Sequence, residues 1–418
     1  MAFVLHPDIK GQGRRAPELA LEEAVSLAAA LPGIEVAGAE VVRLSKVQAG
    51  MLFGSGKIAE LGARFAEMEV GLVLVDGPVS PVQQRNLERE WKVKLLDRTG
   101  LILEIFADRA RTREGVLQVE LAALSYQRSR LVRAWTHLER QRGGFGFVGG
   151  PGETQMEADR RAIDEEVVKI KRQLDKVVKT RELHRAARRK VPFPVVALAG
   201  YTNAGKSSLF NRLTGAEVLA KDMLFATLDP TMRGLTLPGG QKIILSDTVG
   251  FISDLPTQLV AAFRATLEEV LEADLILHVR DIAHPETEEQ AEDVGEILDS
   301  LGVGSDVPMI EVWNKIDLLG PEMRKALLVQ DARTPGIQAV SAVTGDGVDA
   351  LIAAMDEALG GVRIEEVVML PYSDGRGRAW LHEAGVVVAE ADGADGQELT
   401  VRWTERQKEA FGRLGEDG

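Results

Sequence analysis

The chain has 418 residues, enough for roughly two to four domains of ordinary size, and its hydrophobic fraction of 45% is sufficient for sizeable cores. No stretch reaches the roughly 18 to 20 apolar residues that a membrane helix needs, and the absence of cysteine excludes disulfides and thiolate metal sites. The N-terminus lacks the order of a secretory signal, so we expect a cytoplasmic protein with no membrane partner, for which a monomer is sufficient.

The net charge of −14 disfavours nucleic acid as a partner of the chain as a whole. The charge is uneven, however, because residues 109–190 contain 20 lysines and arginines against 11 aspartates and glutamates. That segment carries +9 and the rest of the chain −23. A basic segment in an acidic protein is typical of a contact with nucleic acid. A solvated helical face balanced by acidic neighbours would have the same composition, and charge alone leaves both readings open.

Residues 1–108 alternate between strand-like and helix-like patterns, which predicts a small α/β domain with a parallel sheet. The expected strands are Ile34–Leu44, Val70–Asp76 and Val93–Asp97, and the expected helices are Lys57–Met68 and Ser80–Trp91.

Residues 109–190 follow one-seam helical spacing in two arms, which predicts an antiparallel helical hairpin. A glycine-rich tip at 143–152 separates the arms, and Thr154 with Glu157 fits a capping box that restarts the helix. The seam residues are Leu117, Leu121, Leu124, Leu131, Trp135 and Leu138, then Met156, Ile163, Val167, Ile170, Leu174 and Val177.

Residues 191–360 contain the densest α/β pattern and predict a doubly wound domain, after Pro192 and Pro194 end the preceding helix. Residues 361–418 predict a small α+β domain. The expected strands of the two domains are Val195–Ala199, Ile243–Ser246, Leu275–Arg280, Met309–Asn314, Val367–Leu370, Gly385–Glu390 and Leu399–Trp403.

A phosphate-binding loop with the pattern GxxxxGK[ST] follows the first strand of the 191–360 domain and precedes a helical run. Its backbone N–H groups and the helix N-terminus hold phosphate oxygens. We expect Lys206 to reach the β- and γ-phosphates and the Ser207 hydroxyl to ligate Mg²⁺. The predicted contacts are Gly200, Tyr201, Thr202, Asn203, Ala204, Gly205, Lys206, Ser207 and Ser208.

A DxxG motif ends the next strand and is suited to the same phosphates. Asp247 should hold Mg²⁺ through water, and the Gly250 amide should sense the γ-phosphate, with Thr248 and Val249 between them. In the loop Asp222–Arg233 a switch threonine is expected to close over Mg²⁺, and the residues leave both Thr227 and Thr231 as candidates.

The sequence Asn314-Lys315-Ile316-Asp317 follows a further strand and predicts guanine recognition. An aspartate there accepts two hydrogen bonds from guanine, whereas adenine would leave a buried carboxylate unpaired. Ser341-Ala342, after the strand-like run Ile337–Val340, completes the base pocket. Four motifs in this order resemble the translation-factor-related class of GTPases, whose fold is a doubly wound sheet with ligands at the strand carboxyl ends.

Two positions bear on the rate of GTP hydrolysis. Many GTPases have glutamine after the DxxG glycine to orient the attacking water, but this chain has Phe251, so we expect slow intrinsic hydrolysis that needs help from elsewhere. In related GTPases an asparagine at the position of Asn203 binds K⁺, which can stand in for a missing arginine finger. The alternative, that Asn203 only shapes the loop, stays equally open.

Four longer strings outside the common GTPase motifs resemble the HflX family. They are Pro81–Glu88, Asp97–Gly115, Pro151–Gln155 and Phe225–Thr231. The resemblance implies a bacterial GTPase that binds the large ribosomal subunit and its rRNA, and splits or rescues stalled ribosomes. It also implies that Thr227 is the switch threonine, acting with Lys206 and Gly250 in catalysis. The implied nucleotide contacts of this loop are Phe225, Ala226, Thr227, Leu228 and Asp229.

In this family the hairpin tip is thought to approach the peptidyl-transferase centre. Phe145 and Phe147 could then stack on exposed bases, and Arg140 and Arg142 could pair with rRNA phosphates. The competing hypothesis is a GTP-regulated ribosome-biogenesis or RNA-binding module in which hydrolysis is incidental. Stimulation of GTP hydrolysis by large subunits would distinguish the two.

Overall fold

The structure is a computed structural model that describes most of the chain and divides it into two compact units. One unit comprises Met1–Val178, Lys221–Asp229 and Asp254–Ala265, and the other comprises Lys179–Ala220, Pro230–Ser253 and Thr266–Gly418. No helix among the described residues is long and apolar enough to cross a membrane. The description leaves out residues 12–14, 142–150, 189–192, 217–223, 226–230, 254, 256–268, 305–306, 332, 361–363, 394–395, 404–406, 409–410 and 413–418.

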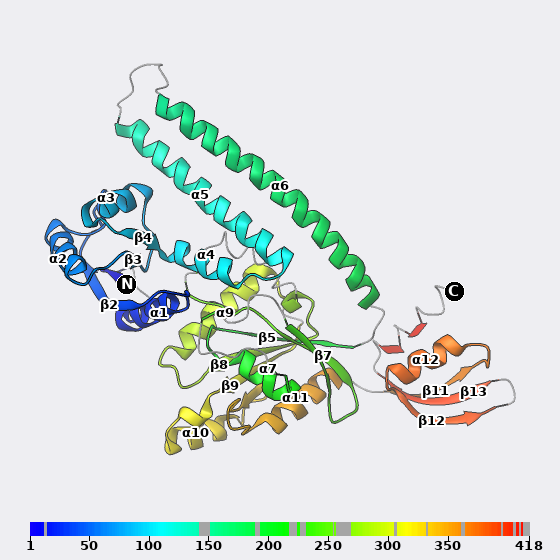
Figure 1. Cartoon of the computed structure of the whole chain (residues 1–418). Helices are drawn as coiled ribbons and strands as arrows, with labels where there is room; N and C mark the ends of the chain where they lie inside the picture. The colour runs from blue at the N-terminus through cyan, green and yellow to red at the C-terminus, as the bar shows by residue number, and fades with distance from the viewer. Residues whose placement is uncertain are drawn as a thin grey trace. The chain divides into compact units, whose positions relative to one another are not determined.

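The N-terminal domain is a four-stranded, all-parallel sheet in the order β2-β1-β3-β4, which confirms the predicted α/β class. Phe3, Phe65 and Trp91 pack in its core, with ring centroids 5.1 and 5.2 Å apart. Central strand β1 was not predicted. The elements are β1 (Ala2–Ile9), α1 (Pro17–Ala29), β2 (Val36–Leu44), α2 (Ser55–Glu67), β3 (Leu72–Val75), α3 (Pro81–Trp91), β4 (Lys94–Asp97) and α4 (Arg98–Arg109) (Figure 1).

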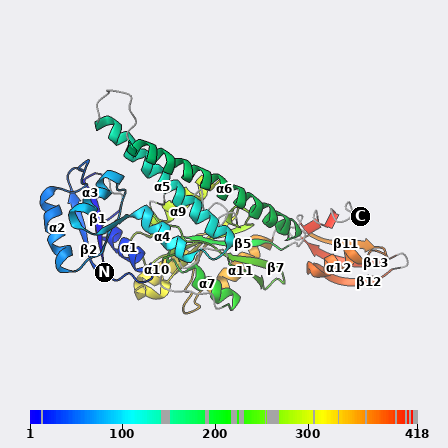
Figure 2. The same cartoon turned by 45° about the horizontal axis from the view of Figure 1, so that its top comes forward.

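Two long helices, α5 (Arg113–Gln141) and α6 (Pro151–Arg188), follow this domain and confirm the predicted hairpin. They lie side by side in both views (Figures 1 and 2), and Arg128 of α5 pairs with Asp164 of α6 at 3.1 Å. The predicted capping box at Thr154 is wrong, because α6 already begins at Pro151. Proline suits the first helical position, since its ring fixes φ and no N–H is needed there.

The second unit contains a six-stranded sheet in the order β10-β9-β8-β5-β7-β6, in which only β6 is antiparallel. Helices α7 and α11 share one core with β5 and β8, and α9 and α10 pack on the other face, so the sheet is doubly wound as predicted (Figure 1). The elements are β5 (Val195–Gly200), α7 (Lys206–Thr214), β6 (Thr231–Thr236), β7 (Lys242–Asp247), β8 (Leu275–Asp281), α9 (Thr287–Leu301), β9 (Met309–Asn314), a short 3-10 helix (Ile316–Leu318), α10 (Pro321–Asp331), β10 (Ile337–Ala339) and α11 (Val348–Gly360).

The C-terminal segment forms a three-stranded antiparallel sheet with one helix, the predicted α+β arrangement. Leu381 of the helix packs against Leu399 and Trp403 of the central strand. The elements are β11 (Ile364–Leu370), α12 (Gly375–Glu383), β12 (Val387–Asp392) and β13 (Gln397–Trp403).

Candidate nucleotide site

Two glycines allow the backbone conformation of the loop between β5 and α7. Gly200 has φ 152°, and a Cβ there would lie 2.2 Å from the carbonyl oxygen of Val279. Gly205 has φ 93°, and a Cβ would lie 2.2 Å from Nδ2 of Asn314. Asn203 is left-handed at φ 60°, a conformation that asparagine tolerates better than most residues. The remaining loop residues, including Tyr201, Thr202 and Ala204, therefore follow a path that leads directly into α7.

Lys206 begins α7 and is buried, with 6% of its surface exposed. Its Nζ donates hydrogen bonds to the carbonyl oxygens of Gly200 (3.1 Å) and Tyr201 (2.7 Å). Burial lowers the pKa of Lys206 to about 8, and the nearby charge of Asp247 opposes the shift. His278 of β8 does not add a second cation, because burial lowers its pKa to about 4. Lys206 is thus a buried ammonium that an anion would hold in its charged form.

Ser207 and Asp247 meet at the carboxyl ends of the central strands. The Ser207 hydroxyl donates to Oδ2 of Asp247 at 2.6 Å, and Asp247 is fully buried at the end of β7. The neighbouring Thr248 is fixed by a hydrogen bond from its hydroxyl to the carbonyl of Leu198. A hydroxyl and a carboxylate are the oxygen donors that Mg²⁺ prefers, and such sites are completed by phosphate oxygens and water. The pair therefore fits the ion that we expected here.

Gly250 and Phe251, which follow Val249, lie directly on this loop. A Cβ at Gly250 would be 2.8 Å from Cα of Thr202 and 3.0 Å from Nζ of Lys206, so only glycine fits. The Phe251 side chain is buried, with 1% of its surface exposed. An apolar ring in the interior cannot orient a water molecule, which agrees with the expectation drawn from its residue type.

The expected guanine-binding residues converge on the same loop. Asn314 donates from Nδ2 to the carbonyl of Ala204 at 2.8 Å and accepts from the backbone N–H of Ala342 at 3.0 Å. Ser341 donates from its hydroxyl to Oδ1 of Asp317 at 2.6 Å. The intervening Lys315 pairs with Asp281 at 2.8 Å, and Ile316 is buried.

Arg212 of α7 is a residue that the motifs did not point to. Its Nε donates to the carbonyl of Ala342 at 3.0 Å, and a terminal nitrogen donates to the carbonyl of Val343. The arginine thus ties the helix behind the phosphate loop to the loop beside Asp317. Its place in the sequence, six residues after Lys206, matches no motif, and only the fold brings the two segments together.

Several predicted site residues fall outside the part of the chain that the structure describes. Phe225 is described, has φ 55°, and its ring centroid lies 4.6 Å from that of Phe106, whereas Thr231 lies in β6. Arg140 lies in α5, but its side chain is outside the described part, and Ser208 lies in the first turn of α7. The residues outside the described part are Ala226, Thr227, Leu228, Asp229, Arg142, Phe145 and Phe147.

Four family models match consecutive parts of the chain. They are described as GTP-binding GTPase N-terminal (residues 18–107), GTP-binding GTPase Middle Region (109–188), 50S ribosome-binding GTPase (195–315) and HflX C-terminal domain (326–417). The chain is also 52% identical over 388 residues to the GTPase HflX of Magnetococcus marinus, covering 93% of this chain and 89% of the relative. The chain belongs to the HflX family of GTPases.

A second relative and one solved structure agree with this assignment. The GTPase HflX of Escherichia coli is 46% identical over 82% of this chain and 80% of its own length. A crystal structure described as a complex of SsGBP and GDP matches with a TM-score of 0.50 and 25% identity, covering 86% of this chain and 98% of that one. The reaction class of the family is GTP hydrolysis.

Proposed function

We propose that this protein binds the large ribosomal subunit and couples GTP binding and hydrolysis to ribosome splitting, remodelling or rescue. The observation that carries the GTPase part is the convergence of Lys206, Ser207 and Asp247 at one strand end, with Ser207 and Asp247 2.6 Å apart. The basic segment 109–190, with a net charge of +9, supports the ribosomal part. The description of the model that matches residues 195–315, a 50S ribosome-binding GTPase, points the same way.

In this proposal each residue at the phosphate end has one task. The Lys206 ammonium binds the β- and γ-phosphates, and the Gly250 N–H donates to the γ-phosphate. Ser207 and Thr227 ligate Mg²⁺, and Asp247 holds it through water. A bound Mg²⁺ ion would supply positive charge beside the phosphate oxygens.

At the base end, Asp317 accepts two hydrogen bonds from guanine, and the Asn314 contacts with Ala204 and Ala342 hold the pocket to the phosphate loop. The Ser341 hydroxyl orients the Asp317 carboxylate. GTP and GDP contain the same base, so the base pocket binds both. In this proposal, Gly250 and Thr227 distinguish GTP from GDP.

In this proposal, a partner of the protein determines when GTP is hydrolysed. Phe251 is buried and apolar, so no side chain at that position orients the attacking water. Contact with the ribosome would supply the missing group, and a K⁺ ion, if Asn203 held one, would be a second source of positive charge. The intrinsic rate would therefore be low.

The decisive experiment measures multiple-turnover GTP hydrolysis alone and with purified 50S, 30S or 70S particles. We expect at least tenfold stimulation by 50S subunits, no stimulation by 30S subunits, and no turnover by Lys206→Ala under any condition. An unchanged rate with 50S subunits would contradict the proposal and favour a binding module in which hydrolysis is incidental. Light scattering of 70S particles with a GTP analogue then separates splitting from subunit assembly.

The guanine contact has its own test. Asp317→Asn replaces an acceptor with an amide that can donate, so GTP affinity should fall roughly 10- to 100-fold, the range expected for hydrogen bonds to a charged group. Xanthosine triphosphate, which has a carbonyl where guanine has an amine, should gain affinity. Competition against ATP, GTP and xanthosine triphosphate measures the preference, and an unchanged order would refute the assignment.

A further inference from the structure

The segment Gly250–Ser253, which we call the switch segment, is joined to the phosphate loop by three hydrogen bonds. The Phe251 N–H donates to the carbonyl of Gly200 at 3.1 Å, and the Thr202 N–H donates to the carbonyl of Phe251 at 2.6 Å. These two bonds form a parallel bridge between Tyr201 and Phe251. The third bond differs because it uses a side chain.

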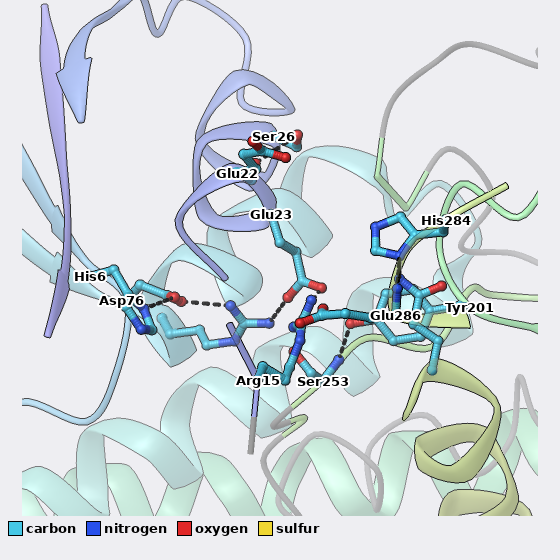
Figure 3. A network of polar contacts seen from close by, with 12 residues as sticks. His6, Arg15, Glu22, Glu23, Ser26, Asp76, Tyr201, Ser253, His284 and Glu286 are labelled. Carbon is cyan, nitrogen blue, oxygen red and sulfur yellow. Dashed lines mark hydrogen bonds and ion pairs between the residues drawn. The ribbon is translucent and has the colours of Figure 1, made fainter. Parts of the chain in front are cut away.

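That third bond runs from the backbone N–H of Ser253 to the hydroxyl of Tyr201, at 2.7 Å (Figure 3). Tyr201 and Ser253 each expose only 5% of their surface, so the bond is shielded from water. Hydrogen bonds in such surroundings are electrostatically stronger than in water. The backbone of the residues on either side of Tyr201, Gly200 and Thr202, therefore holds Phe251, and the Tyr201 hydroxyl holds Ser253.

The switch segment contains Gly250, which lies close to both Lys206 and Thr202. The space for a Cβ at Gly250 lies 3.0 Å from Nζ of Lys206 and 2.8 Å from Cα of Thr202. The carbonyl of Tyr201 is also an acceptor for Lys206, at 2.7 Å. Tyr201 thus contacts the Lys206 ammonium directly and is linked through Ser253 to the segment that contains Gly250, the two groups to which the proposed function assigns the γ-phosphate.

We infer that Tyr201 is a positioning residue whose hydroxyl fixes the switch segment so that the Gly250 N–H meets the γ-phosphate. The inference rests on the proposed function of Lys206 and Gly250. It adds that Tyr201 is the residue that places Gly250 beside Lys206. GDP lacks the γ-phosphate, so the hydroxyl contributes to the binding of GTP and not of GDP. A role in folding alone would affect both nucleotides equally.

Tyr201→Phe removes the hydroxyl and keeps the ring and the backbone bridge. We expect the dissociation constant for a non-hydrolysable GTP analogue to rise roughly three- to tenfold, the range that one intramolecular hydrogen bond supports, with the GDP constant unchanged. The intrinsic kcat should fall by a similar factor. The control is Tyr372→Phe in the C-terminal segment, where the exposed Tyr372 hydroxyl donates a hydrogen bond to the carbonyl of Gly393 at 3.0 Å.

Titration calorimetry without ribosomes measures both nucleotides, and thermal unfolding verifies that each variant is folded. Equal changes for the GTP analogue and GDP, or no change for either, would overturn the inference. If Tyr201→Phe does not fold, Ser253→Pro removes the donor from the other side and should give the same GTP-selective loss. Failure of the unaltered protein to bind any GTP analogue would instead contradict the proposed function, so the two failures are distinguishable.

Discussion

Lys206 shows how a single residue is prepared for an anionic ligand. Burying an ammonium group costs free energy because the group loses its hydration by water. Here burial lowers the pKa of Lys206 to about 8. Two loop carbonyls, those of Gly200 and Tyr201, satisfy two of its donors. Phosphate oxygens would supply full negative charge at the same nitrogen and raise the pKa again. The free energy of phosphate binding at this site is therefore linked to protonation of Lys206.

This linkage predicts a pH dependence of GTP affinity. Below pH 8 the Lys206 ammonium is already charged, whereas above pH 8 binding must take up a proton, so the affinity should fall. The decline should approach about tenfold per pH unit above that pKa. Calorimetric titration between pH 7 and pH 9 measures it.

Lys206→Arg is the control, because a guanidinium stays charged throughout that range. Its affinity should be lower overall but independent of pH. A flat profile for the unaltered protein would contradict the prediction.

At the scale of elements, buried ion pairs link α1, α4 and the end of β3 in the N-terminal domain. Arg98, the first residue of α4, donates to Asp76 after β3 at 2.6 Å and also pairs with Glu23 of α1. Each of the three side chains is at most 8% exposed. His6 and Arg15 extend the chain of contacts at its two ends (Figure 3).

Asp97, the neighbour of Arg98, anchors the hairpin to the same sheet. Its Oδ1 caps α4 by accepting the Gly100 N–H at 2.8 Å, and it also accepts the Tyr126 hydroxyl at 2.6 Å. Arg130 donates to its Oδ2 at 3.0 Å. Tyr126 and Arg130 both lie near the middle of α5, so this helix is attached directly to the end of β4.

Arg98→Ala should destabilise the N-terminal domain by roughly 3 to 5 kcal/mol, because it leaves two buried carboxylates without their shared cation. Urea unfolding measures the loss. Arg324→Ala is the control, since its pair with Asp346 at 2.7 Å is solvent-accessible and should contribute little to stability. A loss from Arg98→Ala as small as that of the control would contradict the prediction.

When the pH is lowered, the Arg98→Ala variant should unfold at a higher pH than the unaltered protein. Burial by itself raises the pKa of Asp76, but the contacts with His6 and Arg98 outweigh it and hold the pKa below its usual value of 3.8. The stability from this carboxylate is present above the unfolded pKa and is lost as pH falls through the folded pKa. Without Arg98 the folded pKa rises, so that loss begins at a higher pH.

At the scale of the whole molecule, the dominant feature is the uneven charge, with +9 in residues 109–190 and −23 elsewhere. Some basic side chains of the hairpin pair with neighbours along the helix, such as Lys169 with Glu166 at 2.8 Å. Lys171 and Arg172 are exposed on α6. The basic hairpin attracts a polyanion, whereas the acidic surface of the remaining chain repels it. The protein should therefore approach a polyanion with the hairpin first.

Charge reversal at Lys171 and Arg172 should therefore weaken co-sedimentation with 50S subunits and make it less sensitive to salt. Each lost phosphate contact should reduce the slope of log affinity against log salt by about 1. The matched control reverses two exposed cations outside the hairpin, Lys325 of α10 and Arg376 of α12. Equal effects of the two double variants would show that net charge, and not the hairpin, determines binding.

The sequence by itself determined the parts of this protein in which neighbouring residues suffice. The phosphate loop follows from the contiguous pattern GxxxxGK[ST] at Gly200–Ser207, between an apolar strand run and a helical run. Asp247 and Asp317 could be predicted as site residues because each comes after a run of apolar residues that itself specifies a strand. The family was identifiable for the same reason, since long contiguous strings carry it.

Only the tertiary structure decided which distant residues serve the site. Arg212 contacts a carbonyl 130 residues away, and Tyr201 contacts an N–H 52 residues away, and neither has a local signature. Strand β1 lies at the centre of its sheet although its second half, His6–Ile9, is mixed in polarity. A hydrogen bond to a backbone group requires only a correctly placed donor or acceptor, so the fold, and not the residue pattern, selects its partner.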